Sequence, residues 1–390
     1  MSDKLKKVEH YTHLEELALE PGGIQTAIEN VSGILQELTQ GSGGKFAVQV
    51  KGEGAPGFVA GIDPSDKKFF VGYKKALQTG RIFKSIDDVK KEYANAPHQI
   101  AVFGELFNEL KSVIKNGIYA GDVLFASFVS KKKKLEKIAG VDYLTFMPNT
   151  LKFSIPVDNK SELYQTVRNA KLGVMIHTKF KGTDLKSLSA SFDVNTSKDP
   201  NIANTKSVFI MDARPENVTD KITLDKKIAY TIESKLRVLS TLSRKLGPDD
   251  YVRVKALLKE IEPHINSRIR AGADRLDVSR SFISSLLSRS KAKLKSEKAQ
   301  KERDEIVSNN LNTLKTIILC YKLLFQIKMD IVNAINSVKK KIQTFAELKQ
   351  NNVFEPTNPE GYLIVNLKAK SIIKLVDRFT FSRINFRRHE

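Results

Sequence analysis

The chain has 390 residues, 41% of them hydrophobic, which is enough for one or two packed domains. Lys and Arg number 65 against 44 Asp and Glu, so the net charge of +21 predicts a polyanionic partner, either nucleic acid or an anionic surface. The single cysteine, Cys320, excludes an internal disulfide and a cysteine-rich metal site and indicates a reducing compartment. The most apolar run is broken by charges, and the first nine residues are polar, so neither a membrane span nor a secretion signal is predicted.

The first half of the chain is predicted to hold a helical lead-in followed by a sheet-rich core. In residues 1–45, apolar residues recur at helical spacing until the glycine-rich run at 41–44. Residues 46–225 are predicted to be the first part of an α+β core, interrupted by one amphipathic helix over residues 98–115. Its short β-rich runs, separated by Gly, Pro, Asn and Asp, are KFAVQVK, GFVAGI, KFFVGY, GDVLFASF, YLTFM, LKFSIP, LGVMIHTKF and SVFIMDA.

The second half changes to helical periodicity and then returns to strands. Residues 226–350 are predicted to form a basic helical bundle, whose last and longest helix runs roughly over residues 304–348. Residues 351–390 contain GYLIVNL and SIIKLVDRF, which are predicted to be closing strands of the earlier core. A helical block between strand-rich segments predicts an insertion into one sheet domain.

Two glycine-containing segments could bind phosphate. In GSGGKF, Phe46 follows Lys45 where a P-loop requires Ser or Thr, so this segment is interpreted as a linker. The second segment, Lys51-Gly52-Glu53-Gly54, follows a predicted strand and enters a glycine-rich turn. A lysine amine can attack a phosphate when cationic neighbours or desolvation make it partly neutral. A carboxylate two residues on lies on the same side of a strand, and the glycine lets backbone approach a ligand. The alternative is an ordinary hairpin with exposed charges.

This tetrapeptide matches the K-x-(D/E)-G pattern that opens the active site of ATP-dependent ligases and mRNA capping enzymes, and later parts of that pattern follow in order. Lys74 ends a strand where ligases often place an Arg near the nucleotide. Asp122 in GDVLF resembles the third motif, whose acidic residue binds ribose or metal. Glu360 in EGYLIV closely resembles the fourth, whose carboxylate holds a catalytic magnesium ion. Lys374 in SIIKLVDR resembles the fifth, whose lysine contacts the α-phosphate, with Lys370 in a supporting role.

The chain departs from this pattern at several positions. Glu53 replaces the commoner Asp, and Pro56 stands where ligases often have Arg or Asn for the ribose. Glu105 in FGEL is a rival for the third motif, but it falls inside an amphipathic helix pattern, so Asp122 is preferred. Asp122 is itself shorter than the usual Glu, and only Lys374 matches a motif that usually has two lysines. These departures leave open a degenerate fold that binds a nucleotide without chemistry.

Longer segments resemble an uncharacterised family of large-phage proteins whose members read K-W-D-G-A-P in the first motif. The resemblance covers roughly residues 11–185 and 355–388 and includes THLEELAL, GEGAPGFVAGIDPSDKKFFVGYK and EGYLIVNLKAKSIIKLVDRF. It implies a phage-encoded protein in the cytoplasm of an infected bacterial host, with association to the virion as the alternative.

Together these resemblances imply a ligase-type nucleotidyltransferase fold with ATP-grasp-like antiparallel sheets, ATP and Mg²⁺ as cofactors, and transfer to a nucleic-acid end. Lys51 is the expected nucleophile, and Glu360 with Asp122 the expected metal ligands. The expected nucleotide-binding residues are Glu53, Gly54, Lys74, Asp122, Lys370 and Lys374. Too few residues follow Lys374 for the C-terminal OB domain of DNA ligases, which favours an RNA-ligase type. Nucleic-acid binding should be sequence-independent, because no base-reading motif is present.

Two other hypotheses remain. One is a catalytically inactive nucleic-acid-binding or virion-associated protein, which the charge favours equally. The other is a protein-interaction scaffold built on the bundle, which leaves the ordered motifs unexplained. His177, in the apolar run GVMIHTKF, is interpreted as a satisfied structural histidine.

Overall fold

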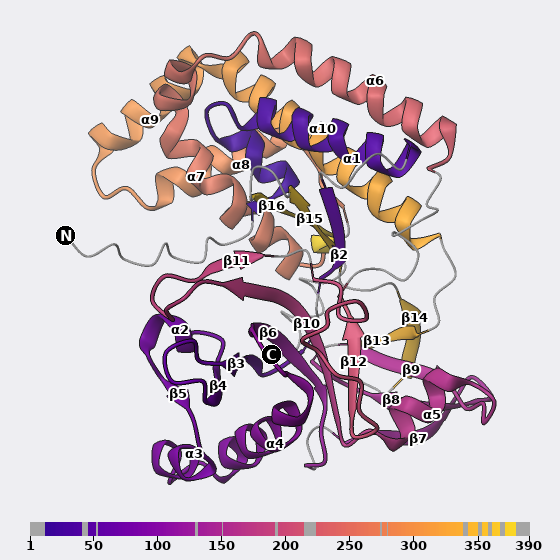
Figure 1. The fold of residues 1–390 in the computed structure, drawn as a ribbon. Helices are drawn as coiled ribbons and strands as arrows, with labels where there is room; N and C mark the ends of the chain where they lie inside the picture. Colours follow the sequence, from indigo (N-terminus) through magenta and orange to yellow (C-terminus); the bar gives the residue numbers. More distant parts are fainter. Residues whose placement is uncertain are drawn as a thin grey trace. The chain divides into compact units, whose positions relative to one another are not determined.

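The structure is a computed structural model (Figure 1). By their contacts, the residues divide into two compact units. The first unit comprises residues 1–10, 47–219 and 339–360, and the second comprises residues 11–46, 220–338 and 361–390. The structure describes residues 12–40, 46–51, 54–128, 132–149, 151–191, 194–213, 224–273, 275–278, 280–337, 342–349, 353–357, 361–366 and 371–379.

The larger sheet of the first unit carries a helical layer on one face. Its strands run in the order β11-β10-β6-β3-β4-β5, antiparallel throughout, and β12 pairs parallel with β10. The strands are β3 (Gly57–Ile62), β4 (Phe69–Tyr73), β5 (Ile82–Phe83), β6 (Ile118–Phe125), β10 (Leu172–Lys181), β11 (Ser189–Ser191) and β12 (Val208–Asp212). The helices of this segment are α2 (Ala76–Thr79), α3 (Ile86–Glu92) and α4 (Pro97–Val113).

The buried side of α4 forms the main core of this unit. Phe103 and Leu106 on α4 pack in one cluster with Phe58 of β3 and Val123 of β6, all at most 1% exposed. Because side chains alternate along a strand, Asp122 of β6 lies on the opposite face of the sheet, away from this helix.

A second antiparallel sheet in the same unit has the order β14-β13-β9-β8-β7. Its strands are β7 (Lys134–Ile138), β8 (Val141–Phe146), β9 (Lys152–Pro156), β13 (Gln343–Lys349) and β14 (Val353–Thr357). The short helix α5 (Glu162–Asn169) follows β9. The strands β13 and β14, distant in sequence, thus complete a sheet that the first 160 residues begin.

The second unit is mainly helical. The strand β16 pairs antiparallel with β15 and parallel with β1. The strand β2 (Phe46–Val50) begins in this unit and continues into the first. The other elements are β1 (Thr12–His13), η1 (Leu14–Leu19), α1 (Gly23–Gln40), α6 (Lys226–Ser243), α7 (Pro248–Arg270), α8 (Arg280–Ala292), α9 (Glu297–Asn309), α10 (Leu311–Asn336), β15 (Gly361–Asn366) and β16 (Ser371–Val376).

The molecule is a mixed α/β protein with several sheets, which agrees with the α+β prediction, while the ligase-type fold stays a prediction. The eight β-rich runs of the core each contain a strand, and the helix expected over residues 98–115 is α4. The long helix expected over residues 304–348 was wrong. It breaks at Asn310 and ends at Asn336, and residues 343–349 form β13, where Phe345 packs on the ring of Tyr143. Apolar residues at 338 and 342 continue the spacing of α10, so tertiary pairing overrides the pattern here.

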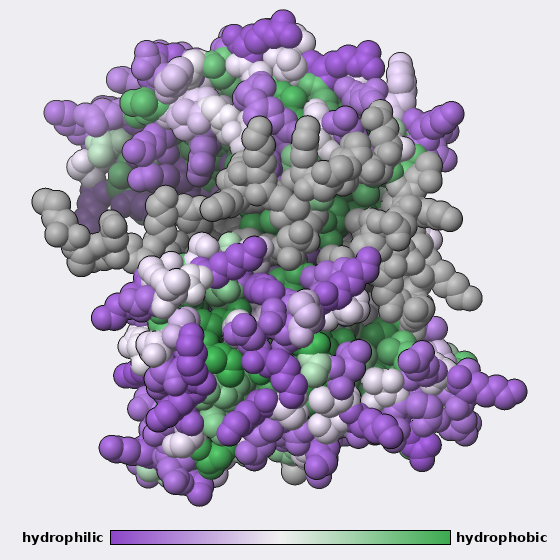
Figure 2. All heavy atoms as spheres, in the orientation of Figure 1, coloured by the Kyte–Doolittle hydropathy of each residue, from purple (hydrophilic) through white to green (hydrophobic). Residues whose placement is uncertain are grey.

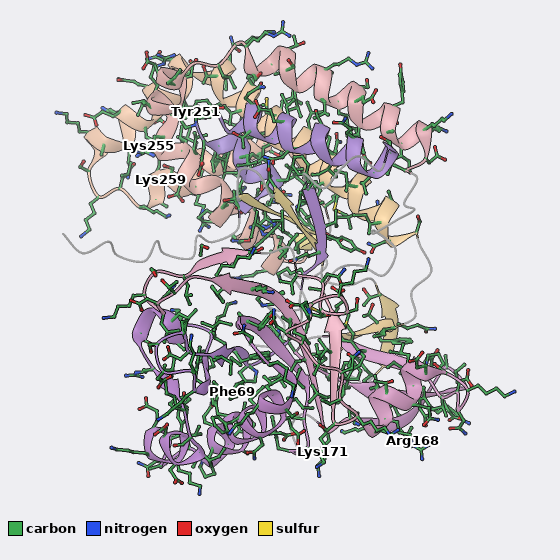
Figure 3. The ribbon with its side chains drawn as sticks, in the orientation of Figure 1. Phe69, Arg168, Lys171, Tyr251, Lys255 and Lys259 are labelled. Carbon is green, nitrogen blue, oxygen red and sulfur yellow. The ribbon has the colours of Figure 1, made fainter. Side chains whose placement is uncertain are left out.

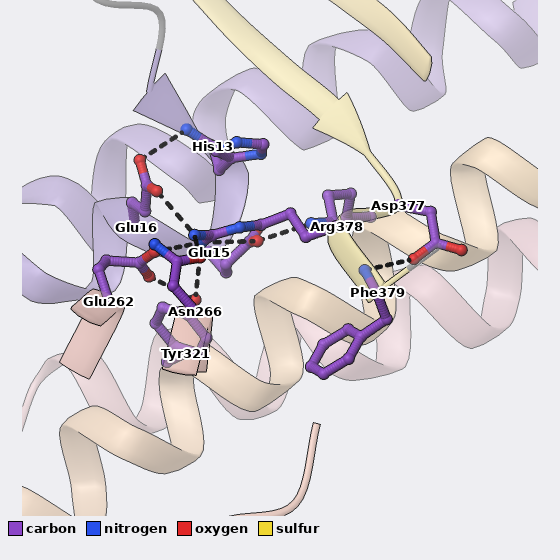
Figure 4. Close-up of polar contacts among 10 residues, drawn as sticks. His13, Glu15, Glu16, Glu262, Asn266, Tyr321, Asp377, Arg378 and Phe379 are labelled. Atoms are coloured by element: carbon purple, nitrogen blue, oxygen red, sulfur yellow. Dashed lines mark hydrogen bonds and ion pairs between the residues drawn. The ribbon is translucent and has the colours of Figure 1, made fainter. Parts of the chain in front are cut away.

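A buried cluster of charges joins distant segments of the second unit (Figure 4). Lys328 of α10 donates to Glu15 of η1 at 2.6 Å, and both side chains are fully buried. Arg378, just after β16, pairs with Glu262 of α7 and donates to Glu16 at 3.3 Å. The cluster therefore connects η1, α7, α10 and the segment after β16.

We predict that Lys328→Met destabilises the protein by about 3–5 kcal/mol, because it removes the close partner of the buried Glu15 carboxylate and leaves only Arg378, at 4.0 Å. Urea unfolding measures this loss. The double variant Glu15→Leu/Lys328→Met should recover most of it, because no unpaired charge remains. The control is Lys235→Met, whose partner Asp330 is partly exposed, and it should cost less than about 1 kcal/mol. An equal loss in Lys328→Met and Lys235→Met would contradict the prediction.

Candidate functional site

The turn at residues 54–57 packs directly onto Asp122. The Ala55 N–H donates to the Val123 carbonyl at 3.3 Å, and the Val123 N–H donates to the Pro56 carbonyl at 3.1 Å. A Cβ at Gly54 would lie 2.4 Å from the Asp122 Cβ, closer than any real side chain tolerates. Only glycine therefore allows this contact, and the last residue of the Lys-Gly-Glu-Gly motif is in place beside the predicted third motif.

Lys74 reaches the same point from the neighbouring strand. It lies just after β4, and its N–H donates to the Gly57 carbonyl at 3.2 Å. Gly57 pairs with Asp122 in the ladder between β3 and β6. A Cβ at Gly57 would lie 3.1 Å from Asp122 Oδ1 and 3.3 Å from Lys74 Cδ. The carboxylate and the lysine side chain thus come together over a position where the missing Cβ leaves room.

His177, which the sequence predicts to be a satisfied structural histidine, lies beside Asp122. Its Nε2 lies 3.6 Å from Asp122 Oδ2, and its Nδ1 lies 2.8 Å from the Thr178 hydroxyl. Burial, and secondly the Lys74 ammonium, lower the pKa of His177 to about 4, so the imidazole is neutral near pH 7. We interpreted His177 as a structural residue. A polar residue in an apolar strand was the only signal, and the pairing of β6 with β10 cannot be read from the sequence.

The other predicted residues are distributed over both units or lie outside the described part of the chain. Lys51 follows β2 and belongs to the first unit, with Gly54, Lys74 and Asp122. Lys374 lies on β16 in the second unit, where it pairs with Leu363. The proximity of Lys51 to Lys374 stays a prediction. The remaining three, Glu53, Glu360 and Lys370, lie outside the described residues.

Glu105, the rival for the third motif, has a structural partner. It lies within α4 and accepts hydrogen bonds from the Ser127 N–H at 2.9 Å and the Ser127 hydroxyl at 2.7 Å. The sequence pattern had placed Glu105 within a helix, and for that reason Asp122 was preferred as the third motif.

Asp122 offers the oxygen chemistry that Mg²⁺ prefers. Among the described residues there is no group of three or more His, Cys, Asp or Glu side chains that could hold a metal ion. Mg²⁺, however, is usually bound through one or two carboxylates together with substrate phosphates. Asp122 Oδ1 faces the space that Gly57 leaves, with Lys74 beside it for phosphate charge. Asp122 could contribute one carboxylate to such a complex, and Mg²⁺ and the nucleotide stay predictions.

Comparison with known proteins places the chain in one family. Residues 8–390 match the model of a family described as a family of unknown function (DUF6267). The chain belongs to this family. No curated protein and no solved structure matches it. In the described part of this family member, none of the helices has the length and apolar character needed to cross a membrane.

We predict that His177 titrates with a pKa of about 4 and that Lys74→Met raises this pKa, because one repelling cation is lost. In the unfolded chain this histidine takes up its proton near pH 6.5, but in the folded protein only near pH 4. The free energy of unfolding therefore falls as the pH is lowered from about 6.5 to about 4. Histidine NMR spectra across this range measure the titration. Lys75→Met is the control and should leave the His177 titration unchanged. A His177 pKa near 6.5 in the unmodified protein would contradict the prediction.

Proposed function

We propose that the protein is a phage-encoded nucleotidyltransferase of the RNA-ligase type, which forms a lysyl-nucleotide at Lys51 and transfers the nucleotide to a nucleic-acid end. The observation that carries the proposal is the packing of the turn after Lys51 onto Asp122, with Lys74 beside it. Gly54 of the first motif and Asp122 of the third thus lie in contact although they are distant in sequence, which supports a shared nucleotide site.

The proposed first step needs a nucleophile, a carboxylate and cations. The Lys51 amine gives up a proton and forms a bond to the α-phosphorus of ATP, while the bond to the leaving pyrophosphate breaks. Lys74 lies where it can offset negative charge that develops on the phosphates. Mg²⁺ held by Asp122 and Glu360 would supply further charge neutralisation. Glu53 and Gly54 would contact the nucleotide, and Lys370 and Lys374 its phosphates.

The second step would transfer the nucleotide from Lys51 to a 5′-phosphate of a nucleic-acid end, with release of the lysine amine. A 3′-hydroxyl then displaces the nucleotide and seals the two ends. The choice of a polymer as acceptor is supported by the net charge of +21, because a phosphate backbone attracts a basic protein regardless of sequence.

The helices of the second unit offer a surface for that backbone. Lys255 and Lys259 are exposed on α7 and lie four residues apart, with Tyr251 one turn before them (Figure 3). Among the described residues, neither lysine has an acidic partner within ion-pair distance. In contrast, Lys293 is paired with Glu260. Figure 2 shows mostly hydrophilic side chains over the helices of this unit.

The second candidate function is a nucleic-acid-binding or virion-associated protein without catalysis. The same unpaired lysines on α7 favour it, because they support binding without requiring any chemistry at Lys51. Only the first candidate function forms a covalent bond between the protein and a nucleotide.

We predict that the full chain incubated with α-labelled ATP or GTP and Mg²⁺ keeps the label on a denaturing gel, because the phosphoramidate bond is covalent. Lys51→Ala should abolish labelling, while Lys75→Ala, which alters an exposed lysine at the start of α2, should label as the unmodified chain does. No label with any nucleotide, together with tight nucleic-acid binding, would reject the transferase in favour of the second candidate.

We also predict that Lys255→Gln/Lys259→Gln weakens binding of a DNA or RNA duplex uniformly across sequences. The slope of log affinity against log salt should fall by roughly 1.5–2, because two phosphate contacts are lost. Fluorescence anisotropy at several salt concentrations measures the slope. Lys90→Gln/Lys91→Gln on α3 removes the same charge elsewhere and is the control. Equal slopes for the two double variants would show that the charge acts without a defined surface.

A further inference from the structure

His177 owes its position to a β-bulge. In the ladder between β6 and β10, Ile176 pairs with Gly121 and Thr178 pairs with Ala120, so His177 is the extra residue between them. A bulge inserts one residue on one strand and re-aims its side chain, and bulges are common beside functional sites. Here the re-aimed imidazole lies beside Asp122, which pairs with Met175 one step along the same ladder.

The partners of the imidazole determine which nitrogen carries the proton. An ionised carboxylate only accepts hydrogen bonds, so the Nε2 that faces Asp122 at 3.6 Å must carry the hydrogen to interact favourably. In a neutral imidazole, Nδ1 is then an acceptor. The Thr178 hydroxyl, 2.8 Å from Nδ1 on a residue that is 4% exposed, must be its donor. The Nε2–H tautomer, with Thr178 donating to His177 Nδ1 and the imidazole N–H directed toward Asp122, satisfies both contacts.

We propose that Thr178 and His177 form a positioning relay for Asp122, in which the hydroxyl fixes the Nε2–H tautomer and the imidazole holds the carboxylate toward the space above Gly57. The inference rests on the proposed function, because it assumes that Asp122 serves the bound nucleotide. His177 is a positioning residue, since it acts through Asp122.

The relay gives a role to the polar pair His177 and Thr178 in a mostly apolar strand. The distance of 3.6 Å is slightly longer than a hydrogen bond, and contacts of this kind often shorten only when the ligand is bound. Partners that orient a ligating carboxylate typically change affinity or activity by roughly 10- to 100-fold when they are removed. An effect of that size is expected from loss of the imidazole N–H alone.

The first experiment measures the tautomer directly. The protein is labelled with ¹⁵N-histidine, and long-range ¹H–¹⁵N spectra are recorded at pH 7.5, with His177→Gln used to assign the signal. We expect the nitrogen shifts of a pure Nε2–H tautomer. Thr178→Val should give a mixture of tautomers, and Thr178→Ser, which keeps the hydroxyl, should restore the pure form. An Nδ1–H tautomer or a mixture in the unmodified protein would overturn the relay.

The second experiment measures the rate of covalent labelling by α-labelled nucleotide. His177→Met should slow labelling roughly 10- to 100-fold, while His177→Gln, whose side-chain amide N–H can occupy the place of Nε2–H, should stay within a few-fold. His98→Met on α4 is the matched control. If the unmodified chain labels and His177→Met labels equally fast, the relay is wrong and the transferase stands. If the unmodified chain does not label, the transferase fails, and the tautomer alone decides the relay.

Discussion

The second unit depends on a buried ion pair between the beginning and the late middle of the chain. Lys328 and Glu15 are 313 residues apart and fully buried, and each charge is offset mainly by the other, with Arg378 a second cation 4.0 Å from Glu15. Their contact fixes η1 against α10. Arg378, which contacts Glu16 and Glu262, adds the third stretch of this unit to the same cluster.

The same cluster fixes the strand that carries the predicted fifth motif. Arg378 follows Lys374 by four residues and is held by Glu262, Glu16 and Asn266. Burial, and secondly the Glu262 charge, raise the pKa of Glu16 to about 7. A raised carboxyl pKa means that the folded protein keeps a proton that the unfolded chain loses, so this group reduces stability as the pH rises from about 4.5 to 7. Because Arg378 directly follows β16 and contacts Glu16, the protonation of Glu16 changes the charge that holds this end of the strand.

Features that depend on neighbouring residues could be predicted from the sequence, whereas features that depend on pairing between distant segments could not. Local patterns located the strands of the core and α4, because alternation and helical spacing act over a few residues. The motif order also predicted that Gly54 and Asp122 lie together, and the two are in contact, while their role in a nucleotide site stays a prediction. The bulge at His177 was not predictable, since it depends on the register between β6 and β10. The strand at 343–349 was missed for the same reason, because its partner β9 lies almost 200 residues earlier.

The packing around Asp122 argues against the interpretation of Lys51-Gly52-Glu53-Gly54 as an ordinary exposed hairpin. An exposed hairpin places no steric demand on its last glycine, whereas Gly54 here has space for hydrogen only. The Asp122 side chain is 14% exposed, and burying a carboxylate this far is unfavourable unless polar partners offset the loss of water. Its surroundings include a lysine, a neutral imidazole and backbone that approaches closely, which are groups suited to a phosphate ester. The turn is therefore packed against a partly buried carboxylate and is not a solvated hairpin, and the orientation of this carboxylate is what the proposed chemistry would depend on.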